Sequence, residues 1–340
     1  MVNWGIAGCG WVARDFAGPA IAASCNGRVV ALFDRDPAAL DGFIAGAVAT
    51  TDLQSFVRTP GLDAVYVATP NDSHRPIVEA CARAGLAVLC EKPMATTLAD
   101  ARAMVAACRD AGVVYATAFD QRFHVAHQAL ARHVANGMVG TVTAIRVVYA
   151  CWVGEAFSGD NWRIDPVRAG GGAMIDLAPH GLDLAQMLLG EPIIGIAAFG
   201  QARVQPYARD GGVRGVDDGA MLAGRSLSGA LISLHVAYNC PETLPRRRLE
   251  IVGTRGQLVA TDTMGQTAGG TVVFTDAADG KARALSIEGI ERSPFLNQVE
   301  AFARTVRGAP FAFTPEQDLH TMELLMRAQS MIAAQAAEVV

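Results

Sequence analysis

A glycine-rich turn near the beginning of the chain constrains its fold more than any other feature. Trp4-Gly5-Ile6-Ala7 is a short apolar run of the kind that forms a buried strand, and the segment from Val12 to Ser24 has helical composition. The residues that join them, Gly8-Cys9-Gly10-Trp11-Val12-Ala13, have the pattern G-x-G-x-x-A. A strand, this turn and a helix in that order predict a unit that binds a dinucleotide.

The residues of this turn have separate roles. Gly8 permits the tight turn, Gly10 lets the backbone approach a pyrophosphate, and Ala13 allows the helix to pack closely on the strand. Trp11 and Val12 open the helix, whose free N–H groups and dipole attract the phosphates. All five residues are therefore candidate cofactor contacts.

An acidic residue follows the second apolar run, Arg28–Phe33. It is Asp34, which stands 24 residues after Gly10. A carboxylate at this place bonds the adenine ribose 2′-hydroxyl and repels a 2′-phosphate, which favours NAD(H) over NADP(H). The neighbouring Arg35 can accept that phosphate or stack on adenine, so NADP(H) stays open as the alternative. The competing interpretation of Asp34-Arg35-Asp36-Pro37 is a solvated turn with a helix cap.

Apolar runs alternate with helical segments throughout the first third of the chain. The further apolar runs are Ala64–Ala68, Ala87–Cys90 and Val113–Ala116, and the helical segments are Pro76–Ala84 and Leu98–Ala111. Continuously apolar strands that alternate with helices predict a parallel sheet covered on both faces. We expect an α/β, doubly wound Rossmann domain over residues 1–121.

The pattern changes after residue 121. A helical segment at Val125–Ala135 and a long strand at Thr141–Tyr149 precede the glycines 170–172, which lead into a helix ending at Leu189. Several strands with turn signals then lie between residues 195 and 275, and two helical segments close the chain, Pro294–Arg307 and Pro315–Ala336. This order predicts an α+β domain with an open, mostly antiparallel sheet over residues 122–340. Two domains agree with the length of 340 residues.

Composition narrows the possible classes of protein. The net charge of −5 argues against binding nucleic acid through its phosphates. No stretch approaches 18 uncharged apolar residues, and the N-terminus lacks the features of a signal peptide, so we expect no membrane span. Seven scattered cysteines without a C-x-x-C pair predict buried thiols in a reducing compartment, the cytoplasm.

Lysine is scarce in this chain. It occurs only at Lys92 and Lys281, whereas the other 26 basic residues are arginine. Lys92 stands in Glu91-Lys92-Pro93, directly after an apolar strand, and ligands bind beyond the carboxyl ends of strands in open α/β sheets. An amine there can stabilise an alkoxide or polarise a carbonyl oxygen, while Pro93 restrains the backbone, for which a cis bond is one way. A surface ion pair between Glu91 and Lys92 is the disfavoured alternative, and Lys281 is interpreted as part of a turn.

A carboxylate and an imidazole are spaced to share one face of a helix. Asp176 and His180 stand four residues apart. Histidine titrates near neutrality and suits general acid–base chemistry, and the aspartate can orient it. Asp183 is interpreted as a cap or a core partner. His124 and His127 have no partnering cysteine or carboxylate cluster, so we interpret them as helix surface or cleft lining and expect no metal site.

Taken together, these motifs resemble the glucose–fructose oxidoreductase, inositol dehydrogenase and rhizopine-catabolism family, written Gfo/Idh/MocA. The resemblance covers nearly the whole chain. Besides the glycine turn, the glycine loop and the Asp176/His180 pair, the matching segments are Ala68-Thr69-Pro70-Asn71 with His74, Glu91-Lys92-Pro93, Gln121-Arg122-Phe123, Trp162-Arg163, Val216-Asp217-Asp218 and residues 249–256. The last two resemble strands of the family's second domain. The chain departs from the pattern at Ala178, where many members have glycine.

The resemblance implies roles for individual residues. Lys92, Asp176 and His180 match the family's catalytic positions. The positions that line the nicotinamide half of the cofactor are matched by Thr69, Pro70, Asn71, His74, Glu91 and Lys92. The positions near the substrate are matched by Arg122, Trp162 and Arg163, together with Lys92, Asp176 and His180.

The resemblance also implies a function and a state of assembly. Members transfer a hydride between NAD(P) and a carbinol or carbonyl carbon of a sugar, cyclitol or related polyol, so we expect an NAD(P)-dependent oxidoreductase. The alternatives are a non-catalytic regulator that senses sugar and dinucleotide, and a glycoside hydrolase of the same fold that uses NAD. The open sheet of the family commonly builds oligomers, so a homodimer or homotetramer is expected, with a small-molecule substrate and neither nucleic acid nor a membrane as partner.

Overall fold

Two compact units make up the chain. The computed structural model describes residues 1–154, 161–205, 207 and 216–338. The first unit comprises Met1–Asp120 and Phe295–Leu319, and the second comprises Gln121–Pro294 and His320–Val340.

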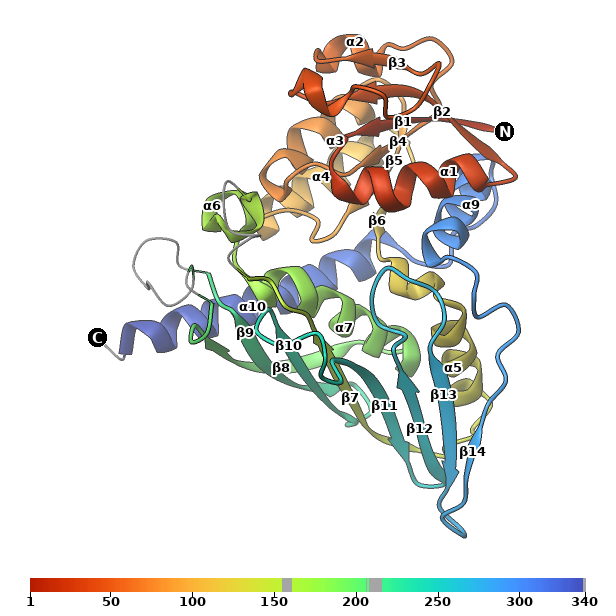
Figure 1. Ribbon diagram of the computed structural model, residues 1–340, viewed down its shortest axis with the longest axis vertical. Helices are drawn as coiled ribbons and strands as arrows, with labels where there is room; N and C mark the ends of the chain where they lie inside the picture. Colours follow the sequence, from red (N-terminus) through yellow and green to blue (C-terminus); the bar gives the residue numbers. More distant parts are fainter. Residues whose placement is uncertain (155–160, 206, 208–215, 339–340) are drawn as a thin grey trace. The chain divides into compact units, whose positions relative to one another are not determined.

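The first unit contains a six-stranded, wholly parallel sheet (Figure 1). Its strands are β1 (Val2–Ala7), β2 (Gly27–Phe33), β3 (Val48–Thr50), β4 (Ala64–Val67), β5 (Ala87–Glu91) and β6 (Tyr115–Ala118). Their order is β3-β2-β1-β4-β5-β6, so the chain starts in the middle of the sheet and winds to each edge in turn. The predicted doubly wound α/β fold is confirmed.

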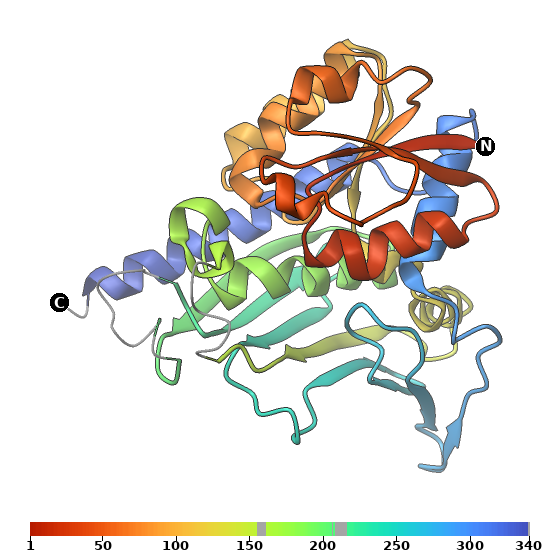
Figure 2. The same ribbon diagram turned by 45° about the horizontal axis from the view of Figure 1, so that its top comes forward.

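Helices cover both faces of this sheet. They are the π-helical turn η1 (Ala13–Ala17) with α1 (Gly18–Ala23), α2 (Leu53–Val57), α3 (His74–Arg83), α4 (Leu98–Asp110) and α9 (Pro294–Val306), with short 3₁₀ turns at η2 (Pro37–Ala39) and η3 (Asn71–Ser73). Figure 2 shows α1 and α9 on one side of the strands and α3 and α4 on the other. β3 and α2 were not predicted, because elements of three and five residues are too short to produce a clear period in the sequence.

A segment from near the C-terminus completes the core of the first unit. The α9 residue Phe302 packs on Trp4 with 5.5 Å between ring centroids, and Phe295 stacks on Phe16 at 5.1 Å. Trp4 and Phe302 are both fully buried. The expected boundary between residues 121 and 122 lies one residue from the change of unit after Asp120. The return of α9 to the first unit was not predicted, because the contacts that hold it there are nonlocal.

The second unit is built on a mixed sheet that has eight strands in the described part of the chain. The order is β14-β13-β12-β11-β7-β10-β9-β8, and only the β7–β10 pair in it is parallel. The strands are β7 (Val142–Ala150), β8 (Ile193–Gln201), β9 (Gly219–Ser226), β10 (Leu231–Ala237), β11 (Arg247–Gly253), β12 (Gly256–Thr261), β13 (Thr271–Asp276) and β14 (Ala282–Ala284). The predicted open, mostly antiparallel sheet is confirmed. Residues 216–218 precede β9 rather than forming a strand.

One face of this sheet is covered by helices. The helical elements of the unit among the described residues are η4 (Asp120–Phe123), α5 (Val125–Ala135), η6 (Trp162–Ile164), α6 (Pro166–Ala169), α7 (Ala173–Leu189) and α10 (Pro315–Glu338). The beginning of α10, up to Leu319, belongs to the first unit. The long helix α7 lies against β7 to β10 (Figures 1 and 2). The Gln186 side chain at its C-terminal end bonds Thr321 of α10 at 2.9 Å and the backbone N–H of Ile193 at 3.3 Å.

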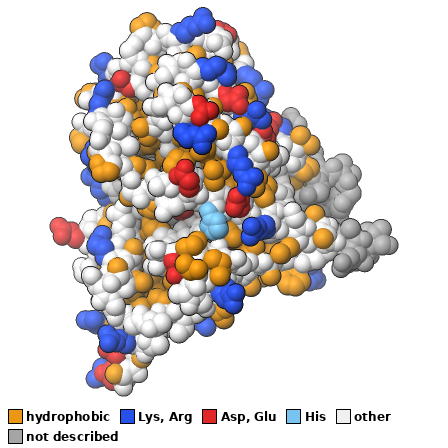
Figure 3. All heavy atoms as spheres, turned by 180° about the vertical axis from the view of Figure 1, so that it is seen from behind, with side chains coloured by type: hydrophobic (Ala, Val, Ile, Leu, Met, Phe, Trp, Pro, Cys, Tyr) orange, Lys and Arg blue, Asp and Glu red, His pale blue; other side chains and the backbone are white. Residues whose placement is uncertain are grey.

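Three features of the described residues concern membrane spans, surface charge and cysteines. No helix among the described residues is long and apolar enough to cross a membrane. On the face drawn in Figure 3, Lys and Arg side chains are interspersed with Asp and Glu rather than forming a continuous basic field.

All seven cysteines lie in the described part of the chain and are free, but only Cys9, Cys81, Cys90 and Cys108 are buried, and Cys25 is exposed. Cys25 lies in the loop between α1 and β2, and Cys151 and Cys240 are half-buried, so the prediction of buried thiols was wrong for these three.

Replacement of Phe302 should show how much the returning helix contributes to the first unit. Phe302→Ala removes a fully buried ring that contacts Trp4, so the free energy of unfolding should fall by about 3–5 kcal/mol. Urea unfolding monitored by tryptophan fluorescence measures the change. Val167→Ala, at a side chain that is 78% exposed, is the control and should change it by less than about 0.5 kcal/mol. Equal effects of the two variants would contradict the role assigned to α9.

Candidate active site

The glycine turn after β1 is shaped by a close approach of the backbone. Gly8 is buried with φ of +90°, and a Cβ built there would lie 2.6 Å from the carbonyl carbon of Ala68 and 2.7 Å from the backbone nitrogen of Thr69. Any side chain at residue 8 would therefore push the turn away from the end of β4. Gly10 is exposed, and a Cβ built there would meet no atom within 4 Å. Open space beside Gly10 is what a pyrophosphate requires.

Asp34 joins the glycine turn to the loop that follows β2. Its Oδ2 accepts a hydrogen bond from the backbone N–H of Cys9 at 2.8 Å, and its Oδ1 accepts one from Asp36 at 3.0 Å. A carboxylate oxygen has two lone pairs, so each oxygen can still accept a hydroxyl proton from a ribose. Asp36 caps η2 through the N–H of Ala38 at 2.9 Å. The helix-cap interpretation therefore holds for Asp36, whereas Asp34 supports the turn.

Two further residues of this region border the turn. Trp11 is 49% exposed and its ring lies edge-on to Phe16, at 5.4 Å between centroids. Arg14, which the sequence analysis did not single out, donates to the carbonyl oxygens of Cys9 at 3.1 Å and Ala39 at 2.5 Å. Arg14 thus holds the loop after Asp34 against the turn. No local pattern could identify it, because its second partner lies 25 residues away.

The segments that follow β4 and β5 are tied together by a buried histidine. The His74 ring is fully buried, with Nδ1 3.0 Å from the carbonyl oxygen of Met94 and Nε2 3.0 Å from that of Thr69. Burial lowers the pKa of His74 below its usual range. Since both ring nitrogens face protein carbonyls, any contribution of His74 to cofactor binding passes through the loops that it joins.

Lys92 follows the last residue of β5. It is half-buried, and its backbone N–H donates to the Glu91 carboxylate at 3.2 Å. The peptide bond between Lys92 and Pro93 is cis, the form that the sequence analysis considered for this proline. Asn71 in η3 is 5% exposed, and the buried hydroxyl of Thr69 has no hydrogen-bond partner among the described residues. A buried hydroxyl of this kind suits a polar group of a bound ligand.

Asp176 and His180 lie on α7, as predicted. The Asp176 carboxylate accepts a hydrogen bond of 2.6 Å from the phenol of Tyr238, which follows β10. His180 is 4% exposed, and its ring packs edge-on against Tyr149 of β7 at 5.6 Å between centroids. The pKa of Tyr238 is raised well above its usual value by burial and by the Asp176 charge, so the phenol remains a donor. Tyr238 was missed because its partner is 62 residues away.

The N-terminus of α7 is held by the carboxylate of Asp217. Asp217 accepts hydrogen bonds from the backbone N–H groups of Gly172 at 3.1 Å and Met174 at 2.8 Å. A Cβ on Gly172 would lie 2.0 Å from the carbonyl oxygen of Asp217, so only glycine permits this approach. Burial raises the pKa of Asp217 to about 6. The helix then runs on to Leu189 through Pro179, one residue before His180.

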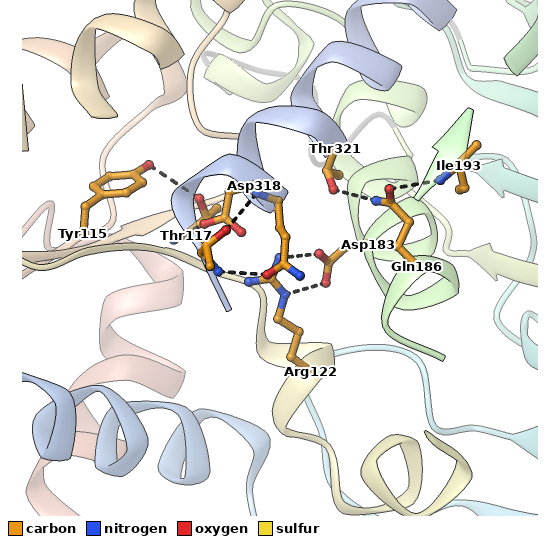
Figure 4. Close-up of polar contacts among 10 residues, drawn as sticks. Tyr115, Thr117, Arg122, Asp183, Gln186, Ile193, Asp318 and Thr321 are labelled. Carbon is orange, nitrogen blue, oxygen red and sulfur yellow. Dashed lines mark hydrogen bonds and ion pairs between the residues drawn. The ribbon is translucent and has the colours of Figure 1, made fainter. Parts of the chain in front are cut away.

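Arg122 is buried in an ion pair with Asp183. The guanidinium is 2% exposed, with Nε 2.8 Å from Asp183 Oδ2 and Nη2 bonded to Oδ1 (Figure 4). Asp183 supplies the charged partner that a buried cation needs, and the position near the substrate that the resemblance implies for Arg122 stays a prediction. Asp183 is the core partner that the sequence analysis considered, and the pair fastens η4 to α7 (Figure 4).

The remaining expected residues fall into two groups. Trp162 and Arg163 lie in η6, half-buried, with the guanidinium 4.6 Å from the Trp162 ring centroid. His124 and His127 are fully buried, which corrects their assignment to the helix surface or a cleft. His124 caps α5 through the N–H of Ala126, and His127 contacts Thr263 Oγ1 at 3.0 Å. Burial lowers their pKa values to about 4 and about 3. Among the described residues no cluster suited to a metal ion was found.

Comparison with known proteins places the chain in a family. The pattern of an oxidoreductase family with an NAD-binding Rossmann fold matches residues 2–119, and that of the GFO/IDH/MocA C-terminal domain matches residues 127–259. The chain belongs to the Gfo/Idh/MocA family. It is therefore an NAD(P)-dependent oxidoreductase, and the glycine turn and Asp34 lie in its dinucleotide-binding unit.

Relatives of this family member act on sugars and cyclitols. It is 36% identical to a 1,5-anhydro-D-fructose reductase of Ensifer adhaerens, over 82% of this chain and 81% of that protein. It is 29% identical to a myo-inositol 2-dehydrogenase of Thermotoga maritima, over 78% and 76%. Among solved structures, an aldose-aldose oxidoreductase of Caulobacter crescentus has a TM-score of 0.86 at 24% identity, with 98% of each chain covered. That likeness shows that the fold is shared.

Titration of Asp217 should be visible in the stability of the protein. Its carboxyl holds a proton more tightly in the folded protein, where its pKa is about 6, than in the unfolded chain, where it is about 4. The folded state therefore binds more protons in this interval, and the contribution of Asp217 to the unfolding free energy should fall as pH rises from about 4 to about 6.

Urea unfolding of the wild type and of Asp217→Asn across this pH range measures the contribution as the difference between the two curves. That difference should decline with rising pH. Asp279→Asn, in an exposed turn, is the control and should show no such decline. Parallel curves for the wild type and Asp217→Asn would contradict the assigned titration.

Proposed function

We propose that this oxidoreductase transfers a hydride between nicotinamide and a carbinol or carbonyl carbon of a sugar, cyclitol or related polyol. The observation that carries the proposal is the combination, in one chain, of a dinucleotide-binding unit with a helix that presents Asp176 and His180 on one face. The names of its relatives support the substrate class.

Three side chains are proposed to act on the substrate. During oxidation His180 takes the proton of the hydroxyl group, and Asp176 orients His180 or bonds the substrate. Lys92 stabilises the negative charge that develops on the oxygen. The nicotinamide supplies hydride transfer at its C4 atom. The proposal requires that Lys92, of the first unit, and His180, of the second, reach the same substrate in the complex.

The other expected residues act in support of these three. We propose that Trp162 and Arg163 contact the substrate, and that Thr69, Pro70, Asn71 and Glu91 line the nicotinamide half of the cofactor. Arg122 is proposed to lie near the substrate and also to hold, through Asp183, the helix that carries His180. His74 is proposed to act through the two loops whose carbonyl groups it contacts.

We propose that NAD(H) is the preferred cofactor. The Asp34 carboxylate keeps acceptor capacity on both oxygens, which suits a ribose hydroxyl and repels a phosphate. Arg35 is the one feature nearby that would favour NADP(H). Parallel assays with the two cofactors test the preference, and faster turnover with NADP(H) would overturn it.

Replacement of Lys92 or His180 should abolish most of the activity. A placed proton acceptor contributes about 10²–10⁴-fold to the rate, so Lys92→Ala and His180→Ala should each lower kcat by about this factor while NAD(H) affinity is retained. The assay is the absorbance of reduced nicotinamide with a panel of sugars and polyols. Lys281→Ala, in an exposed turn after β13, is the matched control and should leave kcat unchanged.

The outcomes of this assay separate the three functions considered for the chain. Turnover of a polyol with net NADH production supports the dehydrogenase. Dinucleotide binding without turnover of any panel member would indicate a sensor, and glycoside cleavage without net NADH would indicate a hydrolase. Unchanged turnover in Lys92→Ala or His180→Ala would remove that residue from the mechanism.

We propose that the uncovered face of the second unit's sheet binds a second copy of the chain. Large apolar side chains gather on this face, with Phe199, Leu231 and Met221 exposed by 67%, 61% and 50%. Phe199 of β8 pairs directly with Met221 of β9, so the two form one patch. A contiguous apolar patch on an exposed sheet face is typical of a protein–protein interface.

A charge placed in this patch should separate the copies. Met221→Asp puts a carboxylate among apolar side chains, so light scattering should show an oligomer for the wild type and a monomer for the variant. Val167→Asp, exposed on α6, is the control and should keep the oligomer. A monomeric wild type would overturn this proposal.

We also propose that the protein works in a reducing compartment, the cytoplasm. All seven cysteines, each within the described residues, are free thiols. Thiols persist where glutathione and thioredoxin keep them reduced.

A further inference from the structure

A buried phenol lies on the strand beside the one that leads to Lys92. Tyr66 is fully buried in β4, and its backbone pairs with Leu89 of the parallel strand β5. Glu91 stands two residues after Leu89, so it shares a sheet face with Tyr66. The Tyr66 hydroxyl donates a hydrogen bond of 2.7 Å to Glu91 Oε1. The phenol therefore reaches the carboxyl end of the strand that precedes Lys92.

The hydroxyl of Tyr66 is a polar group in an otherwise apolar, buried strand. The other residues of β4 are Ala64, Val65 and Val67, all buried, as is usual for a parallel strand covered on both faces. A buried hydroxyl costs free energy unless it is bonded, and a bond to a carboxylate is a strong one. Burial and the Glu91 charge raise the pKa of Tyr66 well above its usual value, so the phenol stays protonated and donates.

The second oxygen of the same carboxylate holds the backbone of Lys92. Glu91 Oε2 accepts a hydrogen bond from the Lys92 N–H at 3.2 Å, while Oε1 is held by Tyr66. Bonds to both oxygens fix the plane of the carboxylate, and the carboxylate in turn fixes the direction in which the chain leaves β5. The other side of Lys92 is also held, since His74 contacts the carbonyl of Met94 at 3.0 Å.

We propose that Tyr66 is a positioning residue for catalysis, which acts on Lys92 through the carboxylate of Glu91. The inference rests on the proposed catalytic role of Lys92 and goes beyond it by naming the group that sets the position of the amine. Tyr66 touches neither substrate nor cofactor in this scheme. Its hydroxyl orients Glu91, and Glu91 orients the main chain from which the Lys92 side chain extends.

Removal of the Tyr66 hydroxyl should lower kcat more than it affects binding. Tyr66→Phe keeps the ring in the core and removes the phenol bond to Glu91 Oε1, so the carboxylate holds the Lys92 backbone less firmly. A misplacement of 1 Å can cost about 10²-fold in rate, and a partial loss of position should lower kcat about 10-fold. The KM of the substrate and the affinity for NAD(H) should change by less than about 2-fold, because the ring remains and no ligand contact is lost.

Tyr115→Phe is the matched control. Tyr115 lies on β6, the next strand after β5, is 5% exposed, and its hydroxyl is 3.5 Å from Thr117 Oγ1 rather than near Glu91. This variant also removes a buried phenol from the same sheet, so it reports the general cost of that loss. Its kcat should match the wild type. An equal fall of kcat in Tyr66→Phe and Tyr115→Phe would overturn the proposal, as would an unchanged kcat in Tyr66→Phe.

A double-mutant cycle with Glu91→Gln tests whether Tyr66 acts through Glu91. The glutamine offers one acceptor oxygen, so it cannot hold the Tyr66 hydroxyl and the Lys92 N–H on separate oxygens. The kcat of the double variant should therefore equal that of Glu91→Gln alone. A further 10-fold fall in the double variant would show that Tyr66 acts by another route and would overturn the proposal.

Lys92→Ala distinguishes this inference from the proposed function. If Lys92→Ala loses turnover while Tyr66→Phe does not, the positioning role fails and the catalytic role of Lys92 stands. If Lys92→Ala keeps full turnover, the catalytic role fails and the positioning role falls with it.

Discussion

The contact between Gly8 and the end of β4 is the constraint on which the first unit depends. Because no Cβ fits between the turn and the backbone of Ala68 and Thr69, the two segments that are proposed to border the cofactor meet directly. Asp34 bonds the same turn from the other side. One close backbone approach thereby brings three segments together, from the ends of β1, β2 and β4, and this explains why a glycine is required there.

The second unit uses polar side chains for a similar purpose. Asp217 holds the beginning of α7, Tyr238 holds Asp176 near its first turn, and Arg122 holds Asp183 beyond His180. Each partner comes from a different segment of the chain. A helix fixed at three points presents its side chains in one orientation, and this is the property that general acid–base chemistry requires.

Particular residues show how far sequence reasoning extends. The scarcity of lysine separated Lys92, at a strand end, from Lys281, which pairs with Asp279 in an exposed turn as predicted. The interpretation of His124 and His127 as helix surface or cleft lining was wrong, because spacing along a helix does not show which face is buried. The partner of Arg122 was not predicted either, since the Asp183 carboxylate is 61 residues away along the chain.

The sequence by itself determined the alternation of the longer strands and helices, the dinucleotide-binding turn and the Asp176/His180 face, because each depends on residues close together along the chain. Only the tertiary structure decided which groups support them. Tyr66, Tyr238, Asp217 and Arg14 reach their partners across strands or loops, and the return of α9 to the first unit joins residues about 300 positions apart. Contacts between distant segments leave no local period or spacing, so they come into view only when the chain is folded.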